Sequence, residues 1–163
     1  MQDETQDTAI TGGGKAVRAE GISWRRLPPA TLLAALAAAA ANATIYFAAS
    51  ALGLIPLDLP VPTPGGEQPL TVVPVVVGSA VGAIGAALVF ALIGLFARRP
   101  VGLFRIVSVV VLVLSLAEPL IIPGAPVSMV LSLQAMHAAA WAVIVGLLTV
   151  LARRGDSDEA RTT

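Results

Sequence analysis

The sequence has no cysteine, a single histidine, and few charges for its 163 residues. The absence of cysteine excludes disulfides, thiol nucleophiles, and Cys-ligated zinc or iron–sulfur centres. One histidine, His137, excludes a metal site built from several imidazoles. A net charge of zero gives no electrostatic footprint for nucleic acid. We therefore expect no metal, no cofactor and no nucleic-acid partner.

The shortage of charge also excludes an ordinary soluble domain. Charged residues make up 12% of the chain, against about 25% in soluble domains. Hydrophobic residues make up 56%, and the mean hydropathy is +0.87. Such a chain has too few charges for a surface facing water and too many apolar residues for disorder over most of its length. The composition predicts an integral membrane protein, with the lipid bilayer as its surroundings.

Four apolar stretches are long enough to cross a bilayer as helices, which takes about 20 residues each. They cover residues 29–55, 72–97, 101–122 and 127–152. Proline and glycine interrupt the chain between the first and second stretches and between the third and fourth, and Arg98-Arg99-Pro100 separates the second from the third. The last two connections are short, which favours antiparallel neighbours.

The predicted fold is an all-α four-helix transmembrane bundle made of two hairpins. Its membrane domain covers residues 24–154, and polar tails at 1–23 and 155–163 are expected to be disordered. The first stretch exceeds the 7–15 apolar residues of a signal peptide, so we expect it to be retained.

The basic residues indicate one orientation. All ten Lys and Arg lie before the first stretch, around the join of the second and third, or after the fourth. In a four-span chain these places share one side of the membrane. The positive-inside rule makes that side cytoplasmic. The sequence thus predicts a multi-pass protein of the plasma membrane with both termini in the cytoplasm.

Small residues indicate how the helices pack. Gly78 and Gly82 form a GxxxG pattern in the second stretch, and Gly85 lies beside it. Such a surface lets another helix backbone approach closely. The first stretch carries a face of small residues at helical spacing that includes Ala38 and Asn42. Two interpretations remain open, packing of these faces inside one bundle and a seam between two copies of the chain.

Polar residues within the apolar stretches are the candidate functional groups, because such groups are costly in lipid. They are Asn42, Glu118, Gln134 and His137. Each also has a structural interpretation: an interhelical hydrogen bond for Asn42, a hydrated helix end for Glu118, and a hydrogen-bonded core residue for His137. Glu118 and His137 differ in depth by only about 5 Å at 1.5 Å per residue. We therefore expect one inward-facing polar cluster of these four residues, with neither Glu118 nor His137 facing lipid.

Short motifs resemble a family of small four-span membrane proteins of unknown function from high-GC Gram-positive bacteria. They are Ala41-Asn42-Ala43, the glycine-rich second stretch, Leu114–Leu120 (LSLAEPL) and Leu133–Ala140 (LQAMHAAA). The resemblance covers residues 29–152. It implies a fold class and a membrane location, and it brings no activity to transfer.

Two functions fit these observations. The first is a non-enzymatic accessory or interaction subunit, with a membrane-protein partner or a second copy of the chain. The second is a small proton-coupled transporter or channel subunit that uses Glu118 and His137. An enzyme is disfavoured because the sequence lacks the nucleophile-elbow and metalloprotease motifs, and we assign no catalytic residue.

Overall fold

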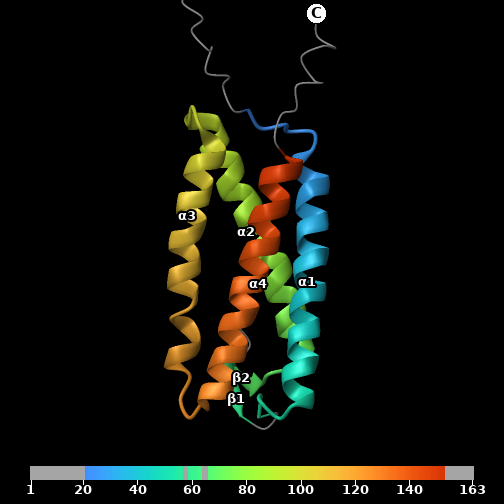
Figure 1. Ribbon diagram of the computed structural model, residues 1–163, viewed down its shortest axis with the longest axis vertical. Helices are drawn as coiled ribbons and strands as arrows, with labels where there is room; N and C mark the ends of the chain where they lie inside the picture. The colour runs from blue at the N-terminus through green and yellow to red at the C-terminus, as the bar shows by residue number, and fades with distance from the viewer. Residues whose placement is uncertain (1–20, 57–58, 64–65, 153–163) are drawn as a thin grey trace, which may run out of the picture.

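The computed structural model describes residues 21–56, 59–63 and 66–152. Four helices run alternately in opposite directions along one long axis (Figure 1). They are α1 (Leu27–Ala51), α2 (Val72–Phe96), α3 (Pro100–Ser115) and α4 (Val127–Leu151), with a 3-10 helix η1 (Glu118–Ile121) after α3. All four are long and apolar enough to cross a membrane, the third when counted through η1. The expected all-α, multi-pass architecture is confirmed.

The first helix ends earlier than predicted, at Ala51 rather than at residue 55. Gly53 adopts a left-handed φ of 67°, which glycine reaches without strain. The Gly53 N–H donates to the Ser50 carbonyl at 3.0 Å, and the Leu54 N–H donates to the Ala49 carbonyl at 2.8 Å. This pair of hydrogen bonds is a Schellman motif, and it stops the helix by satisfying its last carbonyls.

The third stretch, predicted as one helix over residues 101–122, is divided. Helix α3 ends at Ser115, and η1 begins at Glu118. Pro119 has no N–H, and its ring would collide with the carbonyl of Ser115 in a continuous α-helix. The Leu120 N–H instead donates to Ala117 at 3.1 Å. The Leu116 carbonyl, which Leu120 would bond in an α-helix, is left for another donor.

The connection between α1 and α2 contains a β-hairpin, which its proline and glycine content alone did not predict. Strand β1 (Pro60–Thr63) pairs antiparallel with β2 (Gly66–Pro69), and Pro60 lies opposite Pro69. Asp58 lies outside the described residues. The hairpin projects from the end of the bundle that is opposite the described chain ends (Figure 1).

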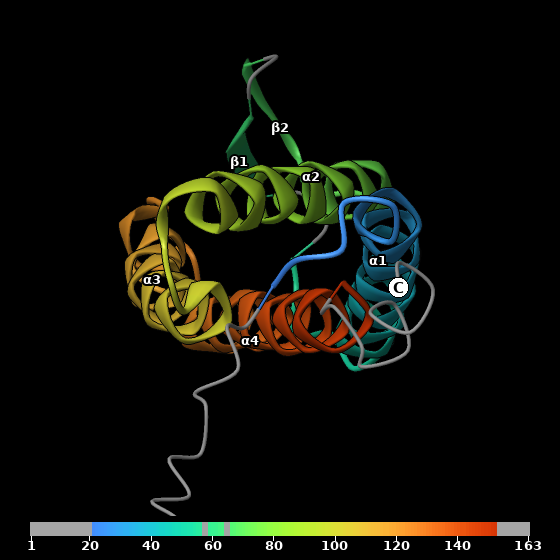
Figure 2. The same ribbon diagram turned by 90° about the horizontal axis from the view of Figure 1, so that it is seen from above.

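The four helices form a ring in the order α1, α2, α3, α4 (Figure 2). Helix α1 packs along both α2 and α4, whereas α3 makes far fewer contacts with its two neighbours. Ala30, Ala34 and Ala38 recur every fourth residue on α1 and are buried, so they allow close helix approach. The principal partner of α4 is therefore α1, and the predicted hairpin of α3 and α4 packs more loosely.

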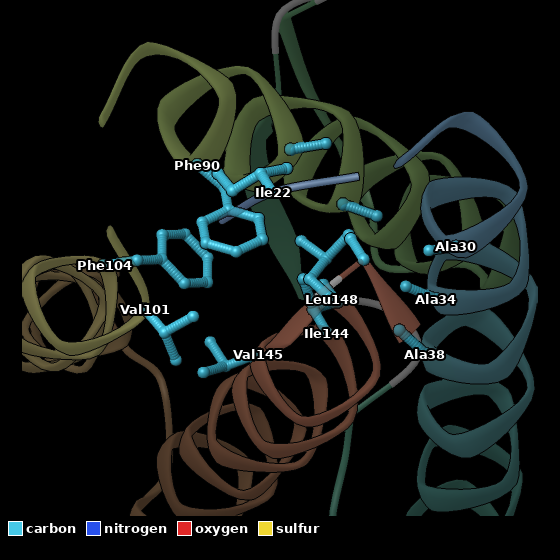
Figure 3. Close-up of a cluster of buried hydrophobic side chains, with 13 residues drawn as sticks. Ile22, Ala30, Ala34, Ala38, Phe90, Val101, Phe104, Ile144, Val145 and Leu148 are labelled. Atoms are coloured by element: carbon cyan, nitrogen blue, oxygen red, sulfur yellow. The ribbon is translucent and has the colours of Figure 1, made fainter. Parts of the chain in front are cut away.

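A cluster of buried apolar side chains fills the end of the bundle where the described chain begins and ends (Figure 3). Phe90 of α2 and Phe104 of α3 lie with ring centroids 4.6 Å apart. Ile22 belongs to the same cluster, and a Cβ on Gly94 would overlap its side chain. The Ser23 N–H donates to the Ala152 carbonyl at 2.9 Å, which fixes both described chain ends at this end.

Candidate binding cavity inside the bundle

Two adjoining cavities lie within the ring of helices. The outer cavity, of about 630 Å³, lies toward the hairpin end between α1, α2, η1 and α4. The inner cavity, of about 350 Å³, lies between α2, α3 and α4. Gly82, His137 and Ile144 line both. The two cavities therefore meet at these three residues near the middle of α2 and α4.

The glycines of α2 provide the room for these cavities. A Cβ on Gly78 or Gly85 would meet no atom within 4 Å, and a Cβ on Gly82 would lie 3.9 Å from Ile144 Cδ1. The GxxxG spacing predicted close helix packing at these glycines, but the structure places them on cavity walls. The buried residues of α2 belong to a neighbouring row instead, which consists of Ser79, Ala83, Ala87 and Phe90. The spacing of the glycines identified a helix face without bulky side chains, but it did not indicate whether that face borders another helix or a cavity.

Asn42 of α1 is buried, with 6% of its surface exposed, and it lines the outer cavity. Its Nδ2 donates to Ser79 Oγ at 3.0 Å, and Ser79 Oγ donates to the Val75 carbonyl at 2.8 Å. Asn42 Oδ1 has no hydrogen-bond partner. An unpaired buried acceptor costs about 1–3 kcal/mol, so this atom is a place where a donor would be favourable. Sequence reasoning missed Ser79, although it is a polar residue inside the GxxxG pattern.

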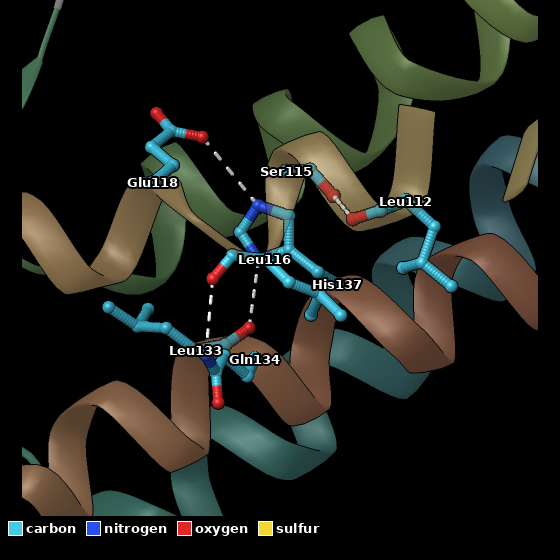
Figure 4. A network of polar contacts seen from close by, with 7 residues as sticks. All are labelled: Leu112, Ser115, Leu116, Glu118, Leu133, Gln134 and His137. Atoms are coloured by element: carbon cyan, nitrogen blue, oxygen red, sulfur yellow. Dashed lines mark hydrogen bonds and ion pairs between the residues drawn. The ribbon is translucent and has the colours of Figure 1, made fainter. Parts of the chain in front are cut away.

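His137 lies on α4 and points toward Glu118 (Figure 4). It lines both cavities. Its Nδ1 lies 2.8 Å from the Leu133 carbonyl, which can only accept, so Nδ1 carries a hydrogen. In the neutral ring, Nε2 is therefore an acceptor. Nε2 lies 3.8 Å from Glu118 Oε2, within ion-pair range if the ring is protonated but too far for a hydrogen bond.

Glu118 begins η1 and lines the outer cavity, while 74% of its side chain is exposed. The cavity therefore reaches the molecular surface at this carboxylate. The His137 side chain is 32% exposed. The break in α3 at Pro119 places the carboxylate at the cavity mouth, whereas a continuous helix would have given it a different direction.

Gln134 takes a separate role. Its Nε2 donates to the Leu116 carbonyl at 3.1 Å, the group that the break in α3 leaves unbonded (Figure 4). Gln134 is not among the residues that line the outer cavity. Of the four residues predicted to form one inward-facing cluster, Asn42, Glu118 and His137 line this cavity. The Glu118 side chain is nevertheless mostly exposed, and Gln134 joins α4 to the end of α3.

The two cavities are lined by few ionisable residues. Glu118 and His137 are the only ionisable residues that line either cavity, and no described Lys or Arg does so. Within the described residues, no group of three or more His, Cys, Asp or Glu could hold a metal ion. In the inner cavity, Trp141 Nε1 is buried without a hydrogen-bond partner. The site thus combines apolar walls with a few polar atoms, as small-molecule pockets commonly do.

Comparison with known proteins gives one match. A sequence model for a family of unknown function (DUF6069) matches residues 22–154. No curated protein and no solved structure matches the chain. The match covers all four helices and both cavities.

Proposed function

The chain belongs to this family of unknown function, and from that premise we propose that it is a non-enzymatic membrane protein, an accessory or interaction subunit that holds a small amphipathic molecule in its cavity. One observation carries the proposal. The outer cavity reaches the surface at Glu118, while the Phe90–Phe104 cluster fills the opposite end of the bundle. A bundle that is filled at one end suits retention of a molecule better than passage through it.

The serine hydroxyls that line the cavities support a binding role rather than catalysis. Ser79, Ser108 and Ser115 each donate to a carbonyl of their own helix at 2.8 Å. A serine nucleophile needs a base within hydrogen-bond reach, and these hydroxyls are committed to the backbone. His137 likewise directs one ring nitrogen to a carbonyl of its own helix.

Filling the outer cavity tests the proposal. In a Trp24→Phe background, Trp141 is the sole tryptophan and reports on the inner cavity. We expect octanol with bromine on its terminal carbon to quench Trp141 saturably in nanodiscs of phosphatidylcholine. Gly78→Leu, whose side chain enters the outer cavity, is expected to weaken this quenching by about tenfold or more, because it removes the volume that the ligand fills.

Gly146→Leu is the matched control, because Gly146 lies on α4, has open space around it and lines neither cavity. Quenching that rises linearly with the probe in every variant reports partition into lipid. If this probe and the corresponding amine and carboxylic acid all gave such a result, the cavity would be rejected as a binding site.

We further propose that the protein lies in the plasma membrane of a bacterium with both termini in the cytoplasm. The Ser23–Ala152 hydrogen bond supports a common side for the chain ends. The described basic residues at that end, Arg25, Arg26, Arg98 and Arg99, favour the cytoplasm for it. A partner subunit or a second copy would lie against the apolar outer faces of the helices. Labelling of single cysteines from each side of the membrane tests the orientation.

A second candidate function is proton-coupled transport, as a transporter or channel subunit. The observation that favours it is the 3.8 Å approach of His137 Nε2 to Glu118 Oε2 at the cavity mouth. Both residues also line the outer cavity.

The second candidate makes its own prediction. In liposomes with an imposed pH gradient, it predicts proton flux above that of empty liposomes, abolished by Glu118→Gln and by His137→Ala. Glu67→Gln, which removes an exposed carboxylate in the hairpin, is expected to keep the flux. The first proposal predicts wild-type flux equal to that of empty liposomes. A flux that survives both cavity substitutions would contradict the role of these two residues.

A further inference from the structure

Three side chains of the outer cavity offer hydrogen-bond acceptors. Asn42 Oδ1 is buried and unpartnered. His137 Nε2 is an acceptor in the neutral ring, because Nδ1 carries the hydrogen that faces Leu133. The Glu118 carboxylate accepts at both oxygens. The Ser79 hydroxyl, in contrast, already donates its hydrogen to the Val75 carbonyl. A ligand that complements this wall must therefore bring donors.

The charge of the site adds a second requirement. With His137 neutral, Glu118 gives the cavity one negative charge, and no described cation lines the wall to balance it. A ligand with one positive charge and several N–H groups meets both requirements. The 3.8 Å between Nε2 and Oε2 suits one ammonium nitrogen between them, because charge-assisted contacts of about 2.8–2.9 Å to both atoms can be made from a single point.

The remaining wall is elongated and mostly apolar, and Trp141 Nε1 is its buried, unpartnered polar atom. On α4 the lining residues extend from Leu133 to Val145, which is about 18 Å at 1.5 Å per residue. The two cavities share Gly82, His137 and Ile144 as lining residues, and Gly82 places no side chain in the space next to Ile144. An unbranched apolar tail would pass from His137 into the inner cavity and reach Trp141, one helical turn farther along α4.

We propose that the two cavities bind a primary alkylammonium ion, with its nitrogen between Glu118 and His137 and its tail beside Trp141. The proposal rests on the proposed binding function and names its ligand class. The same ammonium chemistry occurs in a free alkylamine and in the headgroup of phosphatidylethanolamine. Phosphatidylcholine is the contrasting lipid, because its quaternary nitrogen has no N–H to donate.

The test compares three probes with the same bromine-terminated octyl tail, an amine, an alcohol and a carboxylic acid. Each is titrated into the full chain carrying Trp24→Phe in phosphatidylcholine nanodiscs, and quenching of Trp141 is followed. We expect the amine to bind at least about tenfold more tightly than the alcohol, and the acid to bind most weakly. Glu118→Gln is expected to remove the preference for the amine, and Glu67→Gln to preserve it.

The outcomes separate this inference from the proposed function. Equal affinities for the three probes would overturn the ammonium assignment and leave a general amphiphile cavity. An absence of saturable quenching by any probe would reject both. Repeating the amine titration with phosphatidylethanolamine in the nanodiscs identifies the source of the ammonium. If phosphatidylethanolamine weakens binding of the amine probe, and only while Glu118 is present, the natural ligand is the lipid headgroup. If the affinity for the amine probe is unchanged, the natural ligand is a free amine.

Discussion

A cysteine introduced at Gln68 is expected to react with a membrane-impermeant maleimide in intact cells, whereas a cysteine at Ser23 is expected to react only after permeabilisation. Gln68 is exposed in the hairpin at one end of the bundle. Ser23 lies at the opposite end, where its N–H bonds Ala152. The expected effect is close to all-or-none, because the reagent does not cross the membrane.

The physical basis of this expectation is the distribution of charge along the bundle. In the described residues, the hairpin end carries Glu67 and Glu118 and no basic side chain. Basic residues near membrane helices resist translocation, whereas acidic residues contribute little to orientation. The cysteine-free parent gives no background labelling. Labelling of Ser23→Cys alone in intact cells would show the inverted orientation, and equal labelling at both positions would show a chain inserted both ways.

The four helices were predictable because length and apolar character alone define a span, and the tightest breaks contain proline or glycine. Their partners were not predictable. A helix in lipid is apolar on every side, so its sequence does not tell which face is turned inward. The close pairing of α1 with α4 rests on alanines, which are also compatible with a surface that faces lipid. The exact end of α3 depended on one residue, Pro119.

The candidate site was predictable in part for a related reason. Polar residues are so costly in lipid that Asn42, Glu118 and His137 stood out, and the structure places them around one cavity. Gln134 is not part of this group, because it bonds the Leu116 carbonyl that the break in α3 leaves free. No sequence pattern predicted that free carbonyl. The resemblance to a family of unknown function is confirmed by the match over residues 22–154. That family supplies no ligand, so the ligand class was inferred from the acceptors themselves.

Asn42→Leu and Ser79→Ala are expected to affect stability alike and ligand binding differently. Both remove the hydrogen bond from Asn42 Nδ2 to Ser79 Oγ. Hydrogen bonds between membrane helices contribute about 0.6 kcal/mol on average, so each variant should lose little unfolding free energy in a denaturation titration with SDS. Asn42→Leu also removes the buried, unpartnered Oδ1, and this relieves a desolvation cost. Its stability should therefore equal or exceed that of Ser79→Ala.

Only Asn42→Leu removes the unpartnered Oδ1 of a residue that lines the outer cavity. We expect it to weaken binding of the bromine-terminated amine by about tenfold, which is the loss of one hydrogen bond to a charged donor. Ser79→Ala keeps Oδ1 and should stay within about twofold of the parent. The pair therefore separates the two roles that the sequence left open for Asn42, an interhelical bond and a ligand contact. Equal affinities in both variants and the parent would make Asn42 a structural residue and leave Glu118 and His137 alone to hold the ammonium.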